Sequence, residues 1–435
     1  MKDKIRNSLK YSFFDGAFYS TMFGFGDTYF SPYAIYLKAT NLEMGLLTAL
    51  PGLFSSISQL WAPEFTEKAG RKRFMTATAF LQAVICAPII LVPYIFKNNP
   101  LPFLIAAVTL YSVFYTLSLP AWSSIITQYL PQNKRGRYFS WRQKTCGFIT
   151  IAAMIAAGVI LYLFPRTSVY GFTTLFTVAM LSRFLSWFFL EKMFEPKLNA
   201  KPEAYFSFRD FILRAKQSNF AKFVFFAAFI SFANNISSPF FSVYMLRELK
   251  FDYITFVILS VLPTIAMLVS LPAWGRHADK AGCVGVMRLT SILLPVIPVL
   301  WLVSSNKLYL GAIQAFSGFA WGGFNLAVSN FVFDAVSEEK RVRCVSYYNL
   351  INGLGLFAGA VLGGFVVSGL PPIFGSSLLT IFLLSGIFRF IVRMYFIPKI
   401  QEVKQVCCLS NLDLFFSVTG VRPMLDSSLP PAKID

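Results

Sequence analysis

The sequence lacks the residues that metal and nucleophile chemistry need. It has one histidine, His277, in 435 residues, and a single imidazole cannot build a metal site. Its six cysteines stand at neither metal-ligand nor disulfide-framework spacing. The phosphate-binding pattern G-x-x-x-x-G-K-[ST] is absent, so ATP does not drive this protein through such a loop. We therefore expect no enzyme, no metal and no cofactor.

Charged residues are scarce as well. They form 14% of the chain, against about 25% in soluble proteins, while hydrophobic residues form 56%. Repeated apolar runs are long enough to cross a membrane. This composition predicts an all-α polytopic membrane protein set in a lipid bilayer. The net charge of +19 does not indicate nucleic acid, because the basic residues fall in alternate loops, as topology signals do.

Twelve apolar segments have membrane-spanning length, and a polar stretch divides them into two groups of six. The predicted spans are 12–37, 42–62, 74–96, 101–129, 142–163, 170–190, 220–246, 253–274, 285–304, 308–333, 346–369 and 371–396. The predicted domains are an N-terminal six-helix half (1–190), a cytoplasmic linker (191–219), a C-terminal six-helix half (220–396) and a cytoplasmic tail (397–435). Residues 208–216 of the linker fit either an amphipathic surface helix or a plain solvated segment.

The basic residues test this topology. With the N-terminus inside, 33 of the 39 Lys and Arg fall in inner segments and six in outer ones. The six are Lys38, Lys97, Arg166, Arg247, Lys250 and Lys307. Such a split predicts a multi-pass protein of the cell (inner or plasma) membrane with both termini in the cytoplasm. The first apolar run is too long and too polar for a cleavable signal peptide. The tail is expected to be disordered or to lie on the membrane surface.

Two charged loops occur twice in the chain. Gly275-Arg-His-Ala-Asp-Lys-Ala-Gly282 has a twin 212 positions earlier, Pro63-Glu-Phe-Thr-Glu-Lys-Ala-Gly70. Likewise, Lys134-Arg-Gly-Arg-Tyr-Phe-Ser140 corresponds to Lys340-Arg-Val-Arg-Cys-Val-Ser346, at an offset of 206. Each loop lies between two apolar runs. The chain is therefore predicted to be a duplicated membrane unit, a repeat plan of secondary transporters.

At these loops the chain resembles the major facilitator superfamily. The second copy fits the family pattern through Gly275, Asp279, Lys280 and Gly282, and the first departs from it at Pro63 and Glu67. The resemblance implies a secondary active transporter that works by alternating access, and a cytoplasmic gate in which the two loop acids face arginines of the opposite half. The predicted gate residues are Glu67, Lys68, Gly70, Arg71, Arg135, Arg137, Gly275, Asp279, Lys280, Gly282, Arg341 and Arg343.

The physical basis of such a gate is simple. A carboxylate can cap a neighbouring helix N-terminus or pair with arginines, and each contact contributes about 1–2 kcal/mol at a partly buried site. Because the contact forms only when the cytoplasmic side is shut, it biases a two-state equilibrium. The alternative is that these charges only set topology. His277 is expected to be a solvated loop residue rather than a proton relay.

Asp27 lies about half-way along the first span and is the predicted proton-coupling residue. A carboxylate inside a membrane is costly and marks a functional site by default. Its repeat partners at offset 207 are Asn234 and Asn235, since Ser31-Pro32 matches Ser238-Pro239. The alternative is a buried Asp27 that pairs with a local hydroxyl, from Tyr29 or Thr28.

The substrate site is predicted at the bilayer midplane between the halves. By family geometry its polar and aromatic side chains are Asn234, Asn235, Tyr115, Gln314, Trp321, Asn325, Asn349 and Asn352. Amides with aromatic neighbours suit a neutral polar ligand, although a single aromatic more often packs against lipid. Residues 101–129 contain no basic residue, which argues against a drug/proton antiporter of the type with a central arginine there. It equally argues against an anion carrier, for want of a central cation.

These observations predict a monomeric transporter of a small, neutral polar solute, sugar-like or nucleoside-like, with protons as the coupling ion. Two alternatives stay open. One is an exporter of amphipathic compounds, and the other is a non-transporting membrane sensor on the same scaffold.

Overall fold

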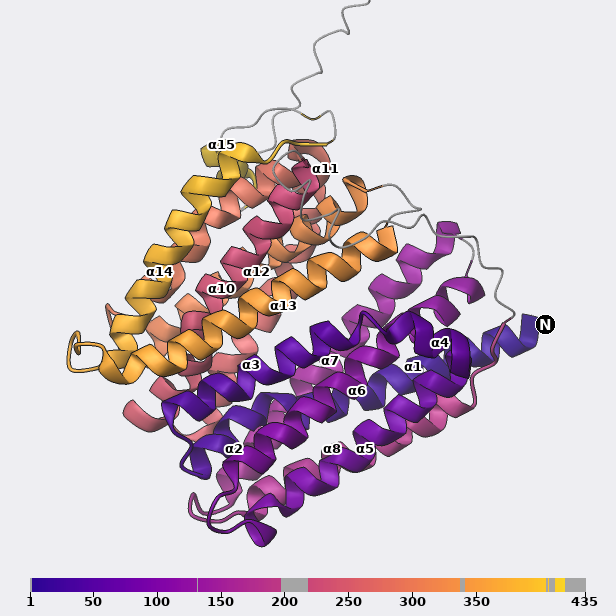
Figure 1. Ribbon diagram of the computed structural model, residues 1–435, viewed down its shortest axis with the longest axis horizontal. Helices are drawn as coiled ribbons and strands as arrows, with labels where there is room; N and C mark the ends of the chain where they lie inside the picture. The colour runs from indigo at the N-terminus through magenta and orange to yellow at the C-terminus, as the bar shows by residue number, and fades with distance from the viewer. Residues whose placement is uncertain are drawn as a thin grey trace, which may run out of the picture. The chain divides into compact units, whose positions relative to one another are not determined.

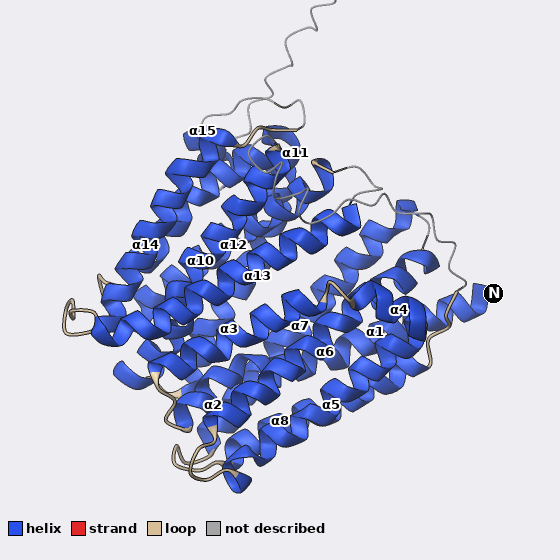
Figure 2. Cartoon of the chain, in the orientation of Figure 1, coloured by secondary structure: helices blue, strands red, loops and turns tan. Residues whose placement is uncertain are grey.

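The computed structural model describes residues 2–130, 132–196, 218–336, 341–403, 406 and 411–418. Within these ranges the chain is helical, and its β-structure is limited to one isolated bridge between Ile373 and Ser376 (Figure 2). The segment 208–216, with its two predicted conformations, lies outside the described residues.

Figure 1 shows the helices in chain order. The elements are α1 (Lys2–Phe25), η1 (Asp27–Tyr29), α2 (Phe30–Tyr36), α3 (Asn41–Ser58), α4 (Ala62–Ala69), α5 (Arg71–Ile95), α6 (Leu101–Tyr129), α7 (Gln132–Leu163), α8 (Tyr170–Glu191), α10 (Asn219–Val243), η2 (Tyr244–Glu248), α11 (Tyr253–Leu300), α12 (Lys307–Asp334), α13 (Arg341–Val366), η3 (Val367–Gly369), α14 (Ser377–Phe396), η4 (Ile397–Lys399) and α15 (Asn411–Val418).

The predicted fold class, an all-α polytopic membrane protein, is confirmed. Eight helical segments of the described chain are long and apolar enough to cross a membrane. One of them, α11, covers the two predicted spans 253–274 and 285–304. The non-helical residue Gly282 interrupts its 48 residues between those spans. The predicted spans 12–37, 42–62 and 308–333 form helices of lower hydropathy, α1 with α2, α3 and α12. The count of twelve spans stays a prediction.

The first predicted span is two helices rather than one. The α-helix ends at Phe25, Gly26 is a turn residue with φ −101° and ψ −75°, and a 3₁₀ turn leads into α2. Glycine weakens a helix interior, and Pro32 cannot supply a backbone N–H to a continuous helix. The break therefore places Asp27 in the turn between two helices.

Two compact units make up the packing. Unit 1 contains Met1–Lys201, Asn235–Val261 and Leu356–Leu370, and unit 2 contains Pro202–Asn234, Leu262–Gly355 and Pro371–Asp435. The helices α10, α11 and α13 each contribute residues to both. These units differ from the two six-helix halves, so the halves remain a division of the sequence.

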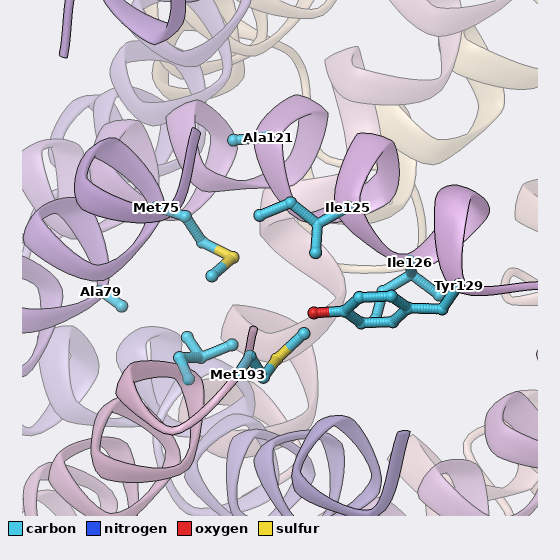
Figure 3. Packing of buried hydrophobic residues seen from close by; sticks show 8 residues of the cluster. Met75, Ala79, Ala121, Ile125, Ile126, Tyr129 and Met193 are labelled. Carbon is cyan, nitrogen blue, oxygen red and sulfur yellow. The ribbon is translucent and has the colours of Figure 1, made fainter. Parts of the chain in front are cut away.

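The core of unit 1 joins three elements at one end of its bundle. The helices α5 and α8 pack side by side, α5 also packs against α6, and α8 also packs against α1 (Figure 1). The buried cluster consists of Met75, Ala79, Ala121, Ile125, Ile126, Tyr129, Leu190 and Met193 (Figure 3). Tyr129 donates its hydroxyl to the carbonyl of Phe194, so its one polar atom is satisfied inside the apolar cluster.

Candidate functional site

Asp27 is held from another helix by a tyrosine. The Tyr111 hydroxyl, on α6, donates to Asp27 Oδ2 at 2.7 Å. Within the described residues no basic side chain forms an ion pair with Asp27. The predicted local partner Tyr29 is occupied elsewhere, because its hydroxyl donates to the carbonyl of Met154 at 2.6 Å. The described side-chain partner of this carboxylate is therefore a neutral hydroxyl rather than a cation.

A second carboxylate on α1 has opposite surroundings. Asp15 is 5% exposed and lies 3.3 Å from Arg142 Nη2, an ion pair with α7. Its other oxygen accepts from the Ser186 hydroxyl at 2.7 Å, and Ser186 in turn accepts from Arg183 Nη1 at 2.7 Å. This arrangement places one carboxylate and two guanidinium groups in a single network inside unit 1. Both oxygens of Asp15 are thus used to hold α7 and α8 to α1.

Aromatic rings complete this network. The Arg142 guanidinium lies 4.5 Å from the centre of the Trp122 ring, and Arg183 lies 5.4 Å from that of Tyr19. Tyr19 stacks on Tyr115, with ring centres 5.0 Å apart. All five side chains line a cavity of about 100 Å³. This volume holds a few water molecules rather than a substrate, so we assign the cavity to the polar interior of the bundle.

Two arginines outside the segment 101–129 are buried, which the sequence did not predict. Arg183 is 3% exposed and Arg389, on α14, is 1% exposed. Each lies seven residues before the end of its predicted span, and hydropathy alone does not distinguish an inner-surface charge from one turned into the bundle. Their offset of 206 equals that of the repeated basic loops, which is the signal that sequence reasoning missed.

Both terminal nitrogens of Arg389 donate hydrogen bonds within unit 2. Its Nη2 donates to Asn234 Oδ1 at 3.0 Å, and its Nη1 donates to the carbonyl of Leu294 at 3.0 Å. Next to this contact Ser385 donates to the carbonyl of Ala233 at 2.6 Å. The amide oxygen of Asn234 therefore holds α14 to α10 in this structure.

The remaining predicted substrate residues are dispersed. Asn352 on α13 accepts from the Ser231 hydroxyl of α10 at 2.7 Å, and Trp321 packs edge-on to Phe324 at 5.6 Å. Asn325 is exposed. Gln314 and Asn349 are partly buried, and Asn235 is 6% exposed. Asn235 and Tyr115 belong to unit 1 and the other six to unit 2. The shared substrate site stays a prediction.

In the first charged loop, Arg71 ties three segments together. It is 5% exposed at the start of α5, and its Nη1 donates to Ser124 of α6 at 3.0 Å. Its Nε lies 3.5 Å from Glu195, and its Nη2 donates to the carbonyl of Pro196. This predicted gate residue is therefore part of the packing of unit 1, whereas Lys68 is exposed.

In the second charged loop, an acid from the tail caps a helix. Glu402 Oε2 accepts from the backbone N–H of Val284 at 2.7 Å, just after the break in α11 at Gly282. A carboxylate is favourable there because the first N–H groups of a helix lack intrahelical partners. Asp279 and Lys280 are exposed. The side chains of Glu67, Arg135, Arg137, Arg341 and Arg343 lie outside the described part of the chain, so the gate pairing stays a prediction.

The prediction of a solvated His277 is wrong. This residue is 5% exposed, its Nδ1 lies 2.7 Å from the carbonyl of Ala273, and its Nε2 lies 2.9 Å from the Ser417 hydroxyl of α15. Burial lowers the pKa of His277 below 6.5, against the hydrogen bond to Ala273 and with the help of Arg276 and Lys280. The apolar tail segment, too short to span, packs on this loop instead.

Both loop glycines adopt a conformation that other residues avoid. Gly70 has φ +83° and ψ 140°, and Gly282 has φ +79° and ψ 164°. For a residue with a Cβ this region costs about 1–3 kcal/mol. A Cβ on Gly282 would also clash with the Glu402 carboxylate, whereas one on Gly70 would meet nothing.

The Gly282→Ala variant is expected to lose about 1–3 kcal/mol of unfolding free energy from backbone strain alone, plus the cap on Val284. Thermal unfolding in detergent measures this loss. Gly70→Ala is the matched control for strain without the clash and should lose less. Gly275, without a positive φ and in open space, should accept alanine at a gain of up to about 1 kcal/mol. Equal stability of all three variants would contradict the assignment.

The fold and these sites define a polytopic helical membrane protein with a carboxylate at a helix break and a duplicated charged loop. The chain belongs to the Major Facilitator Superfamily, whose sequence model matches residues 16–233 and 223–405. It has the fold of that family's transporters, which are typically carriers rather than enzymes.

The chain is also similar in sequence to curated transport proteins and in fold to solved structures. The "Multidrug resistance protein MdtG" of Dickeya zeae (strain Ech586) is 23% identical over 363 residues, covering 81% of this chain and 85% of that protein. A crystal structure of the nucleoside transporter NupG, in a mutant form, has a TM-score of 0.73 at 17% identity and covers 92% of this chain and 100% of that one. A bacterial homologue of the human lysosomal transporter Spinster, in an inward-facing, unoccupied conformation, has a TM-score of 0.64 at 14% identity and covers 93% and 99%.

Proposed function

We propose that this protein is a secondary active transporter that moves a small, neutral polar solute by alternating access and couples the movement to protons through Asp27. The observation that carries this proposal is the Asp27–Tyr111 hydrogen bond at the break between α1 and α2. A carboxylate held by a neutral hydroxyl is able to change its charge without stranding a cation.

Comparison of the two carboxylates of α1 supports this choice. Asp15 balances Arg142 at 3.3 Å, and its protonation would leave that arginine without its ion-pair partner. Protonation of Asp27 would alter its single described side-chain hydrogen bond, to Tyr111. Asp27 also lies in a turn rather than within a helix, so a change in its charge acts on the junction of two helices. Asp15 is therefore the structural carboxylate of the pair and Asp27 the coupling one.

The neutral cargo follows from how the buried arginines are used. Arg142 faces Asp15, Arg183 donates to Ser186 and Arg389 donates to Asn234. Each of these guanidinium groups has a partner within the protein. The fold likeness to NupG makes nucleosides the first solutes to test.

An exporter of amphipathic compounds is the second candidate. The proteins named multidrug resistance protein MdtG, at 22–23% identity over about four-fifths of their length, favour it. An intramembrane carboxylate also suits a cationic drug. The two candidates differ in what they accumulate and in which direction, so one assay separates them. The cell-membrane location, the cytoplasmic termini, the monomeric state and the cytoplasmic gate complete the proposal.

Transport by purified protein in liposomes with an imposed pH gradient tests the coupling. We expect gradient-driven accumulation of a labelled nucleoside or sugar, and we expect Asp27→Asn to abolish it while exchange without a gradient continues. Tyr111→Phe removes the hydrogen-bond donor and should shift the pH dependence of transport. Tyr170→Phe, at a side chain 64% exposed, is the matched control.

Two outcomes would count against the proposal. If Asp27→Asn still accumulates solute along a proton gradient, Asp27 is not the coupling residue. If only amphipathic cations move, and in the direction of export, the second candidate replaces the first.

A further inference from the structure

Unit 1 contains a pocket of about 770 Å³ at the ends of its helices, on the face that the charge distribution predicts to be outer. It is lined by the C-terminal end of α2, the turn between α5 and α6, the turn between α7 and α8, and the segment from η2 to the start of α11. Its volume falls within the range of about 300–1,000 Å³ that is typical of small-molecule sites.

Three of the six cations predicted on the outer face line this one pocket. They are Lys38, Lys97 and Arg166. Outer segments of membrane proteins are poor in Lys and Arg, so this concentration is notable. The lining contains no Asp or Glu, and none of the three cations forms an ion pair within the described ranges.

Of the acids close to the lining residues in the sequence, Glu248 does not line the pocket, and Glu43 and Asp252 are occupied as helix caps. Glu43 accepts from the backbone N–H of Thr40 at 2.7 Å and closes a capping box at the start of α3. Asp252 accepts from the backbone N–H and the hydroxyl of Thr255, each at 2.8 Å, at the start of α11. Neither carboxylate forms an ion pair with the three pocket cations. The pocket therefore has a net positive charge.

Hydrogen bonds fix the walls of this pocket. The Tyr36 hydroxyl donates to the carbonyl of Thr167 at 3.0 Å and joins α2 to the turn before α8. The fourth outer cation, Arg247, donates to the carbonyl of Ala39 at 2.5 Å and so joins η2 to the turn after α2. The ring of Tyr253 packs edge-on to Phe172 at 6.0 Å. Hydrogen bonds therefore link α2 and the turn after it to the other segments that line the pocket.

We propose that this pocket binds an organic anion that carries a phosphate or carboxylate group on an apolar or aromatic body. The three cations supply charge-assisted hydrogen bonds to the anionic group. Tyr36, Phe251 and Tyr253 supply an apolar and aromatic lining for the body of the ligand. Either a soluble organic phosphate or the headgroup of an anionic lipid has this chemistry.

The position of the pocket gives its occupant a mechanical role. Lys38, Lys97 and Arg166 come from the N-terminal half of the sequence, whereas Leu246, Phe251 and Tyr253 come from the C-terminal half. A bound anion would contact both and would resist their separation. The site is separate from Asp27, so its failure and the failure of proton coupling are distinguished by different variants.

Binding of phenyl phosphate to the full chain in phosphatidylcholine nanodiscs tests the proposal, with phenol as the uncharged control. We expect phenyl phosphate to raise the thermal unfolding temperature and phenol to leave it unchanged. Lys38→Gln, Lys97→Gln and Arg166→Gln should each weaken binding by about tenfold, and the triple variant should abolish it. Lys250→Gln is the matched control for Lys38→Gln. Both lysines are exposed with positive φ, 53° and 63°, and Lys250 does not line the pocket.

A second arm identifies the source of the anion. If the wild type is stabilised in phosphatidylglycerol nanodiscs, the triple variant is not, and phenyl phosphate has no effect, the site takes a lipid headgroup. If neither phosphate source stabilises the wild type, or if the triple variant binds as the wild type does, the proposal is overturned.

Discussion

Replacing Asp15 with alanine is expected to lower the free energy of unfolding by about 3–5 kcal/mol. The variant leaves Arg142 without its ion-pair partner and removes the acceptor of the Ser186 hydroxyl, inside the bundle. A buried charge that loses its partner costs more than the pair contributes, because the remaining ion keeps its desolvation penalty. Thermal or denaturant unfolding of purified protein in detergent measures the loss.

Two variants separate this effect from charge removal in general. Glu191→Ala breaks an exposed pair with Lys72, 4.0 Å apart, and should cost less than about 1 kcal/mol. The double variant Asp15→Ala/Arg142→Met removes one stranded cation and should recover part of the loss. Equal effects of Asp15→Ala and Glu191→Ala would show that the network does not contribute as its geometry indicates.

Replacing Asn234 with leucine is expected to destabilise the protein by about 1.5–3 kcal/mol, because it removes an acceptor from the buried guanidinium of Arg389. Adding Arg389→Met should restore part of the stability, since exchanging both partners for apolar groups removes the desolvated charge. Unfolding free energies of the single and double variants give the coupling. Asn325→Leu is the control, an amide already exposed, and should stay within about 0.5 kcal/mol.

This pair of variants also qualifies the predicted role of Asn234 in cargo binding. A loss of transport in Asn234→Leu with unchanged stability would favour direct contact with cargo. A loss of both, rescued in stability by Arg389→Met, would make Asn234 a positioning residue for α14. If Asn234→Leu is as stable as the wild type, the hydrogen bond to Arg389 contributes nothing measurable.

The sequence predicted those features that depend on hydropathy and repetition. The all-helical membrane fold, the family and the importance of Gly282 followed from apolar runs and from a loop that occurs twice. The first span was predicted as one continuous helix, but the α-helix ends before Gly26. Segment length and hydropathy do not indicate where a helix is interrupted within an apolar run. Arg183 and Arg389 were missed for a related reason: near a helix end, the direction of a side chain is set by packing rather than by composition.

The hydrogen-bond partners of individual polar side chains could not be predicted from the sequence either. Asp27 finds its partner 84 positions away on α6, although nearer hydroxyls exist. His277 is covered by a tail helix 140 positions away. Both contacts join segments that are far apart in the sequence. A hydrophobic period does not reveal which segments pack next to each other in the bundle. The fold class therefore followed from the chain, whereas the partner of each polar group required the structure.

The two copies of the charged loop share a backbone conformation but not the same side-chain contacts. Gly70 and Gly282 share one conformation, yet an arginine meets Glu195 beside the first, and Glu402 meets a backbone amide beside the second. Because residues other than glycine rarely adopt this positive φ, both copies of the loop have glycine at this position, whereas the side chains around it differ. The two copies should consequently respond differently to ionic strength: salt screens the ion pair at the first loop more than the helix cap at the second.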